Sequence, residues 1–230
     1  MPRILIAGAS GGIGSASARA FARKGYEVFA GCHTPIAVQK IEEIGNPKIV
    51  PVTLDVETPD PERIPDNLSI VLNCAGLAPL PDLEALETAH QNPTWWFQHL
   101  ATTAMGAVFL ANAAREKMLW GSLYVSLTSD LALTNQSRHE GLHGGLYAYR
   151  AGRAALNACL LALGHDLHPY GINVIALSPG WVRTRMGGPF APIHADDAGV
   201  RICQTLMNHL AFTPEECTTL IDINGDPLDW

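Results

Sequence analysis

The stretch that decides the fold is Gly8-Ala9-Ser10-Gly11-Gly12-Ile13-Gly14. It follows a short apolar run at residues 3–8 (RILIAG), which is typical of a buried strand, and it opens a segment at 15–24 with helical spacing. Glycines permit positive φ angles and let the backbone approach a ligand closely, while the first N–H groups of the next helix attract a pyrophosphate. A tight turn without a ligand is the simpler interpretation, but the position between a strand and a helix favours a phosphate-binding loop.

Beyond this stretch, predicted strands and helices alternate along the whole chain. Strands are expected at residues 3–8, 26–31, 48–54, 69–72, 122–127, 172–177 and 218–223. Helices are expected at residues 15–24, 36–44, 92–118 and 144–168. This alternation implies parallel strands joined by right-handed crossovers, with helices on both faces of one sheet. The sequence therefore predicts a single α/β domain spanning residues 1–230, with its ligands beyond the carboxyl ends of the strands.

Composition excludes several classes of protein. Hydrophobic residues make up 47% of the chain and charged residues 16%, as in globular proteins with a large core. The 15 Lys+Arg against 22 Asp+Glu give a net charge of −7, which argues against a nucleic-acid partner, because such a partner needs a basic face. No apolar run is long enough to span a membrane, and the N-terminus lacks the layout of a signal peptide. The five cysteines form no C-x-x-C pair, so reduced thiols and a cytoplasmic location are expected.

With three further motifs, the glycine stretch resembles the short-chain dehydrogenase/reductase family. That family opens with T-G-x-x-x-G-x-G, where this chain has Ala7 in place of the Thr. The other motifs are Asp55-Val56, Asn73-Cys74-Ala75-Gly76 and Pro179-Gly180-Trp181-Val182-Arg183-Thr184. The run at residues 149–157 and the C-terminal pattern D-x-x-G-x-P-L-x-W are similar to the sniffer and C-factor-like branch. The resemblance implies a Rossmann-type, doubly wound parallel sheet of about seven strands with helices on both faces.

The resemblance also implies where a dinucleotide would bind. Asp55 and Val56 would lie against the adenine, Val182 against the nicotinamide carboxamide and Thr184 against the phosphates. The whole implied set is Gly8, Ser10, Gly11, Gly12, Ile13, Gly14, His33, Asp55, Val56, Asn73, Ala75, Gly76, Tyr149, Arg153, Pro179, Gly180, Val182 and Thr184. NAD-binding relatives usually end their second strand with an Asp, but residues 31–34 read Gly-Cys-His-Thr, which favours NADP(H) over NAD(H). His33 would lie beside the 2′-phosphate or be an ordinary surface residue.

The catalytic positions depart from the family at one decisive residue. The family uses a Tyr to transfer the hydroxyl proton and a Lys four residues later, and here Tyr149 is followed at that distance by Arg153. Residues i and i+4 share a helix face, so the two side chains form a site or, more simply, a stacked pair on that face. Arg keeps the positive charge that would stabilise a tyrosinate, but it does not release its proton in proteins. Electrostatic support is therefore expected to survive while a proton relay through this residue is lost.

Two more family positions carry hydroxyl groups. Ser129 matches the Ser that orients the carbonyl, and a shift of one residue would select Thr128 instead. Thr103 stands where the family has an Asn that supports a water relay. The residues at 134–145 (TNQSRHEGLHGG) form a polar, glycine-rich loop at the expected rim of the pocket, as a substrate lip, a lid or solvated surface.

Other chemistry-bearing residues favour ordinary structural roles. His139 and His143 lie in a glycine-flanked loop without a Cys or carboxylate cluster, so no metal site is expected. Trp95-Trp96-Phe97 are expected to anchor a helix in the core or at a subunit interface rather than to wall a substrate pocket. The helix that carries Tyr149 has a surface of small residues suited to close helix packing. The resemblance implies a homodimer or homotetramer.

The leading hypothesis is an NADP-dependent oxidoreductase acting on a small carbonyl or alcohol. Tyr149 would be the general acid, Ser129 would orient the carbonyl and Arg153 would give electrostatic support. One alternative is a non-redox member of the fold: an isomerase, a cyclase, a dehydratase, or a lyase similar to halohydrin dehalogenases, which use a Ser, Tyr and Arg set but lack the glycine loop. The other is a cofactor-binding protein that has lost catalysis.

Overall fold

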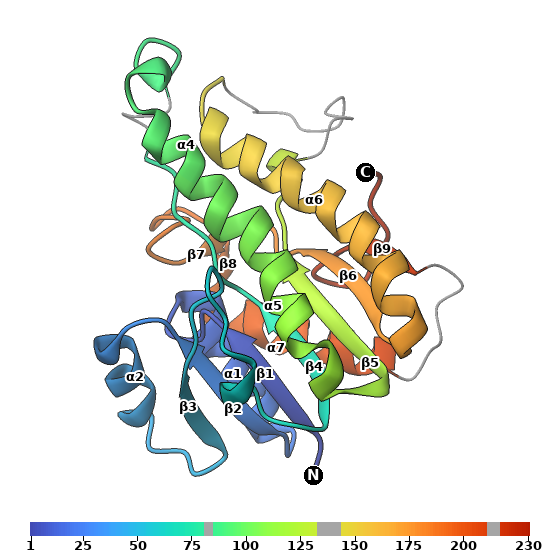
Figure 1. Cartoon of the computed structure of the whole chain (residues 1–230). Coiled ribbons are helices and arrows are strands. Elements are labelled where there is room, and N and C mark those ends of the chain that lie inside the picture. The colour runs from blue at the N-terminus through green and yellow to red at the C-terminus, as the bar shows by residue number, and fades with distance from the viewer. Residues whose placement is uncertain (81–84, 133–143, 211–216) are drawn as a thin grey trace.

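The structure is a computed structural model that describes residues 1–80, 85–132, 144–210 and 217–230 (Figure 1). Within these residues, seven strands form one sheet in the order β3-β2-β1-β4-β5-β6-β9, and each neighbouring pair is parallel. The strands are β1 Arg3–Ala7, β2 Glu27–Cys32, β3 Ile49–Thr53, β4 Leu68–Asn73, β5 Met118–Leu127, β6 Asn173–Ser178 and β9 Thr218–Asp222. The predicted doubly wound parallel sheet is confirmed.

Helices cover both faces of this sheet, as Figure 1 shows. They are α1 Gly12–Arg23, α2 Pro35–Glu42, α4 Pro93–His99, α5 Gly106–Ala114, α6 Tyr147–Leu167 and α7 Ala195–Leu210. Because alternate residues of a strand point to opposite faces, β1 contributes to two cores. Ile4 and Ile6 lie in the core shared with α1, α2 and α7, whereas Leu5 lies in the core shared with α5 and α6. No helix of the described ranges is long and apolar enough to cross a membrane.

The long helix predicted at 92–118 is interrupted in the structure. Its start is as predicted: Pro93 occupies the first turn, and the Asn92 side chain accepts a hydrogen bond from the N–H of Trp95 at 3.2 Å. A π-helical turn, Leu100–Met105, then separates α4 from α5. A 3-10 turn, Arg115–Lys117, continues α5 to within one residue of the predicted end at about Met118. The strand predicted from residue 122 begins earlier, because β5 starts at Met118, which pairs with Leu68 of β4.

Among the described residues, helix α7 is the one long element that was not predicted from the sequence. It packs against α1, where an added Cβ on Gly199 would lie 2.5 Å from the carbonyl carbon of Ala16. An ion pair of 2.5 Å between Arg19 of α1 and Asp196 in the first turn of α7 joins the same two helices. This pairing lowers the pKa of Asp196, mainly through the hydrogen bond from Arg19. The position of α7 thus depends on a backbone contact that only glycine permits.

We predict that Gly199→Ala lowers the free energy of unfolding by about 1–3 kcal/mol, because α1 and α7 must separate to admit the methyl group. Urea unfolding followed by circular dichroism measures the change. The matched control is Val200→Ala on the same helix, where the native side chain is 50% exposed. A surface change of that kind shifts stability by about 0.5 kcal/mol or less, so equal losses in both variants would contradict the packing described here.

Candidate functional site

The glycine turn joins β1 to α1 at the carboxyl edge of the sheet, where β1 lies between β2 and β4. Gly8 has a φ of +72°, and an added Cβ would lie 2.9 Å from the backbone nitrogen of Ala75. At Gly14 an added Cβ would collide with the carbonyl oxygen of Gly8. Both positions therefore need glycine, one for its conformation and both for space.

Helix α1 begins at this turn with no side chain capping it. Its N-cap residue is Gly11, and both Gly11 and Gly12 are exposed. Uncapped N–H groups and the positive end of a helix suit a phosphate group. An added Cβ on Gly12 would lie 2.5 Å from Cγ2 of Thr184, so the segment after β6 meets the same turn. The structure thus brings together two predicted phosphate contacts, with Ser10 and Ile13 partly buried in the same turn.

Asn73 ties the ends of β4 and β5 together. Its side chain is 1% exposed, and its Nδ2 donates to Ser126 Oγ at 3.2 Å. Its Oδ1 accepts a hydrogen bond from the N–H of Ala75 at 3.0 Å, which shapes the turn after β4. Because Ala75 also lies against Gly8, this predicted cofactor residue holds the β4 turn beside the glycine loop.

Arg153 is a buried cation below Tyr149, 6% exposed. Its Nη1 donates to the carbonyl oxygen of Leu127 at 2.6 Å, and its Cζ lies 5.3 Å from the centre of the Tyr149 ring. An added Cβ on Gly76 would lie 2.6 Å from Nη2, so this predicted cofactor residue makes room for the guanidinium. Burial raises the pKa of the Cys74 thiol to about 12, and the charge of Arg153 acts in the opposite direction. The cation thus sits where β4 and β5 end.

Tyr149 lies at the meeting point of α6 and α4. It is 9% exposed, and its ring makes an edge contact with His99, with centroids 6.0 Å apart. His99 also contacts the ring of Trp95 at 4.8 Å, and an added Cβ on Gly152 would lie 3.2 Å from the His99 carbonyl oxygen. His99 was not among the site residues predicted from the sequence. The spacing in the sequence could have indicated it, because His99 lies one helical turn before the predicted site residue Thr103. Thr103 itself is 2% exposed and lies in the π-helical turn.

The two candidate hydroxyls at the end of β5 have different partners. Thr128 is 3% exposed, and its Oγ1 donates to Oδ1 of Asn157 on α6 at 2.5 Å. Ser129 is partly buried, and its Oγ accepts a hydrogen bond from the N–H of Leu131 at 3.2 Å. That bond leaves the Ser129 hydroxyl proton for another acceptor. The geometry favours Ser129 as the group that faces a ligand and Thr128 as a clamp on α6.

The residues predicted at the nucleoside end follow the carboxyl ends of β2 and β3. His33 follows β2 and is exposed. Asp55 is exposed after β3, and its Oδ1 accepts a hydrogen bond from the N–H of Glu57 at 2.9 Å. Val56 is 6% exposed, and an added Cβ on Gly106 of α5 would lie 2.8 Å from its Cγ2. Val56 therefore also belongs to the core between the sheet and α5.

The segment after β6 is fixed by a short second sheet. Pro179 is buried, and the exposed Gly180 has a φ of +68°. Strand β7 Val182–Arg183 pairs in parallel with β8 Ile193–His194, and Val182 is 4% exposed. This pairing holds the predicted nicotinamide segment above the carboxyl ends of the strands.

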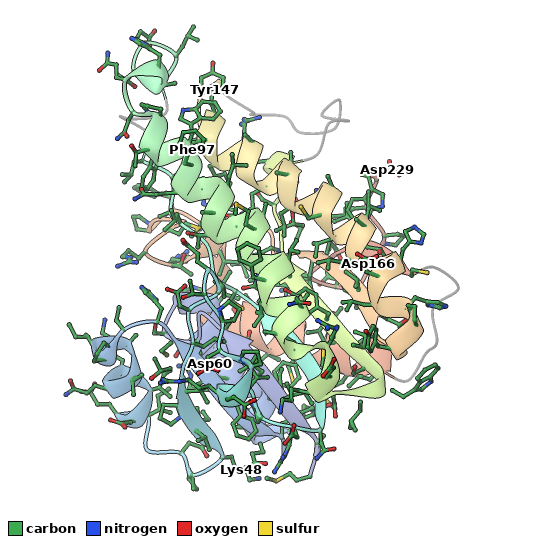
Figure 2. All side chains as sticks on the ribbon, viewed as in Figure 1. Lys48, Asp60, Phe97, Tyr147, Asp166 and Asp229 are labelled. Carbon is green, nitrogen blue, oxygen red and sulfur yellow. The ribbon has the colours of Figure 1, made fainter. Side chains whose placement is uncertain are left out.

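An apolar groove of about 490 Å³ lies where α4 and α6 begin, at the end of the molecule where Figure 2 labels Phe97 and Tyr147. Its lining residues are Leu86, Ala89, His90, Pro93, Trp96, Phe97 and Tyr147. Of the aromatic triplet, Trp95 therefore packs inward on His99, whereas Trp96 and Phe97 line the groove.

Two predicted features fall partly or wholly outside the described residues. The loop at 134–145 is described only at Gly144 and Gly145, and His139 and His143 lie outside.

Within the described ranges, no group of three or more His, Cys, Asp and Glu side chains is arranged to hold a metal ion. The five cysteines are free thiols.

The chain belongs to the short-chain dehydrogenase/reductase family of oxidoreductases: the family model described as enoyl-(acyl carrier protein) reductase matches residues 8–221. The C-signal protein of Myxococcus xanthus is 40% identical over 87 residues, which are 38% of this chain and 51% of that protein, so the match spans about half of this relative. The carbonyl reductase Sniffer of D. melanogaster has a TM-score of 0.81 at 23% identity, covering 100% of both chains. A carbonyl reductase from Pseudomonas aeruginosa PAO1, in complex with NADP, has a TM-score of 0.77 at 26% identity, also covering 100% of both.

We predict that Thr128→Val lowers the free energy of unfolding by about 1–3 kcal/mol, because the buried Asn157 oxygen loses its donor. Asn157→Leu removes the other partner. In the double variant no polar group is left unpaired, so its cost is smaller than the sum of the two single costs. Urea unfolding of the four proteins in this cycle gives the coupling, and strictly additive costs would show that the two side chains act independently.

Proposed function

We propose that the protein is an NADP(H)-dependent oxidoreductase that interconverts a small carbonyl compound and its alcohol. The observation that carries the proposal is the pairing of Tyr149 with the buried cation Arg153, at the end of the strand that leads to Ser129. Membership of the oxidoreductase family supports the reaction class. We further propose that residues 1–230 form one domain and that the protein is cytoplasmic.

The glycine turn fits a dinucleotide, because a Cβ at Gly8, Gly12 or Gly14 would meet a neighbouring atom and α1 begins uncapped. Gly8, Gly11, Gly12, Gly14 and Thr184 would hold the phosphates. The cofactor, when bound, supplies or accepts the hydride. Residues 31–34 contain no carboxylate to repel a 2′-phosphate, which supports NADP(H) over NAD(H). The NADP-bound state of the P. aeruginosa carbonyl reductase supports the same choice.

In this proposal, three side chains handle the carbonyl oxygen. The Ser129 hydroxyl donates a hydrogen bond that orients it, and the phenol of Tyr149 donates the proton that it needs to become a hydroxyl. The guanidinium of Arg153 lies against the ring of Tyr149 and stabilises the negative charge of the tyrosinate that forms when the phenol gives up its proton. Arg153 acts as a fixed charge rather than as a proton carrier, because arginine does not deprotonate in proteins.

We also propose that the protein forms a homo-oligomer through α4, α5 and α6. The outer surfaces of these helices and of the π-helical turn expose large apolar side chains: Phe97 is 69% exposed, Met105 48%, Phe109 39% and Leu161 42%. Several large apolar side chains exposed on neighbouring helices are typical of an interface. Light scattering of the purified protein measures the oligomeric state.

We predict that Tyr149→Phe lowers kcat/KM for NADPH-dependent reduction of aldehydes and ketones by about 10²–10⁴-fold, because the phenyl ring has no proton to donate. NADPH consumption is followed by absorbance, and binding of NADPH and NADH by fluorescence titration. The matched control is Tyr147→Phe on the same helix. Tyr147 lines the apolar groove, so this variant should keep the activity of the wild type. Binding of NADPH without turnover by the wild type would instead support a cofactor-binding protein, and halide release from halohydrins would support the dehalogenase-like alternative.

We predict that Arg153→Met lowers kcat/KM by about 10²-fold, because it removes a positive charge that acts on the developing oxyanion. Arg153→Lys keeps the charge and stays closer to the wild type. The same absorbance assay compares the three proteins at saturating NADPH. If Arg153→Lys were instead more active than a barely active wild type, the arginine would be suppressing catalysis, as expected of a protein that binds the cofactor without using it.

A further inference from the structure

Asp130 is a carboxylate at the carboxyl edge of the sheet to which the proposed function gives no role. It directly follows Ser129 and begins a short 3-10 turn, Asp130–Ala132. Its Oδ1 accepts a hydrogen bond from Oγ of Ser178, the last residue of β6, which is 2% exposed. Ser178 directly precedes Pro179, where the predicted nicotinamide segment starts. Asp130 therefore lies between the Ser proposed to orient the carbonyl and the segment proposed to hold the nicotinamide.

No described residue neutralises the charge of Asp130. Among the described residues its carboxylate forms no ion pair, and the Ser178 hydroxyl is its one side-chain hydrogen-bond donor. Arg153, the buried cation that α6 places at the end of β5, instead donates to the carbonyl oxygen of Leu127. Asp130 is only partly exposed. A carboxylate in such surroundings is screened less than one on the open surface, so it acts on charges of a bound ligand.

We propose that Asp130 determines the charge of the substrate: the site takes carbonyl compounds whose neighbouring group is cationic or neutral, and it disfavours 2-oxo carboxylates and other anions. The inference rests on the proposed function, because it places the carbonyl at the Ser129 hydroxyl. A group attached to that carbonyl then lies close to the residue that follows Ser129. An anionic group there meets the uncompensated carboxylate, whereas an ammonium group is attracted to it.

Three phenyl ketones of similar size test this inference: phenylglyoxylate, which is anionic, its neutral methyl ester, and 2-amino-1-phenylethanone, whose aliphatic amine is cationic as an ammonium. Each is assayed for kcat/KM with NADPH in the wild type and in Asp130→Asn, and the ester serves as the reference. Comparing the two proteins for each compound cancels the intrinsic reactivity of the ketone. In the variant the anion-to-ester ratio should rise about tenfold and the cation-to-ester ratio should fall by a similar factor.

The matched control is Asp166→Asn, the same charge change on an exposed residue near the C-terminal end of α6, labelled in Figure 2. It should leave both ratios unchanged, because Asp166 lies near the other end of α6 from Tyr149. Binding of benzoate and of benzylammonium to the NADPH complex, followed by NADPH fluorescence, gives a second readout. Asp130→Asn should strengthen the binding of benzoate and weaken the binding of benzylammonium.

The outcomes separate this inference from the proposed function. Reduction of the ester by both proteins with equal ratios, or a change confined to NADPH affinity, overturns the role of Asp130 and leaves the oxidoreductase intact. No NADPH consumption with these or any other aldehyde or ketone overturns the proposed function. In that case the binding of benzoate and benzylammonium still decides whether Asp130 selects the charge of a ligand. If Asp130→Asn changed the affinity for both ions equally, this role of Asp130 would be rejected.

Discussion

A parallel sheet covered by helices on both faces leaves only its ends for polar chemistry. In this protein Ile4 and Ile6 are buried on one face and Leu5 on the other, so β1 has no side chain free for a ligand until it ends. The carboxyl ends of the strands, together with the helix N-termini that follow them, are where N–H groups, hydroxyls and charges can accumulate. The glycine turn, the Asn73 network, Arg153 and Asp130 all lie at this edge. Each is constrained by its neighbours there rather than by its own element.

Crowding at this edge explains why small residues matter more there than net charge. Three glycines each face another segment so closely that a methyl group would not fit: Gly8 faces the β4 turn, Gly12 faces Thr184 and Gly76 faces Arg153. The chain carries a net charge of −7, yet a phosphorylated cofactor needs only local N–H groups and the end of a helix dipole. The site is therefore built mainly from backbone, and the side chains that remain are free to set specificity.

The sheet, most helices and the glycine loop could be predicted because they follow from local patterns. Apolar runs stopped by glycine mark the strands, and Asn92-Pro93 marks the start of α4. Helix α7 was missed, although its buried residues Ala198, Ile202 and Leu206 recur at helical spacing. The start of β5 was also missed: the strand was predicted from residue 122, but Met118 joins the sheet through pairing with Leu68, a contact 50 residues away in sequence that no local pattern reveals.

In the candidate site, too, some features could be predicted from the sequence and others depend on contacts between distant segments. Tyr149, Arg153 and Ser129 were predicted from the resemblance to the family's motifs, but the partners of these residues could not be predicted in this way. The contact of His99 with Tyr149, the hydrogen bond from Arg153 to the Leu127 carbonyl and the clamp of Thr128 on Asn157 all join segments distant in sequence. Such contacts depend on how α4 and α6 pack on β5, and packing is decided by complementary shape over the whole interface. Motif spacing can therefore name a residue without showing which way its side chain turns.

The opposite charges near the end of β5 illustrate why that direction matters. Arg153 is 6% exposed and bonded to a backbone carbonyl, so its charge is held in one place and is available to the ring of Tyr149. Asp130 is more exposed, and within the described part of the chain its side chain is bonded to the Ser178 hydroxyl alone, so its charge remains available to a group that enters beside Ser129. A buried, tethered charge is suited to a step that every substrate shares, whereas a partly solvated charge without a counterion can discriminate among substrates. In the proposed function, the divergence of Arg153 from the family would therefore affect catalysis, and Asp130 would affect which carbonyl compound binds.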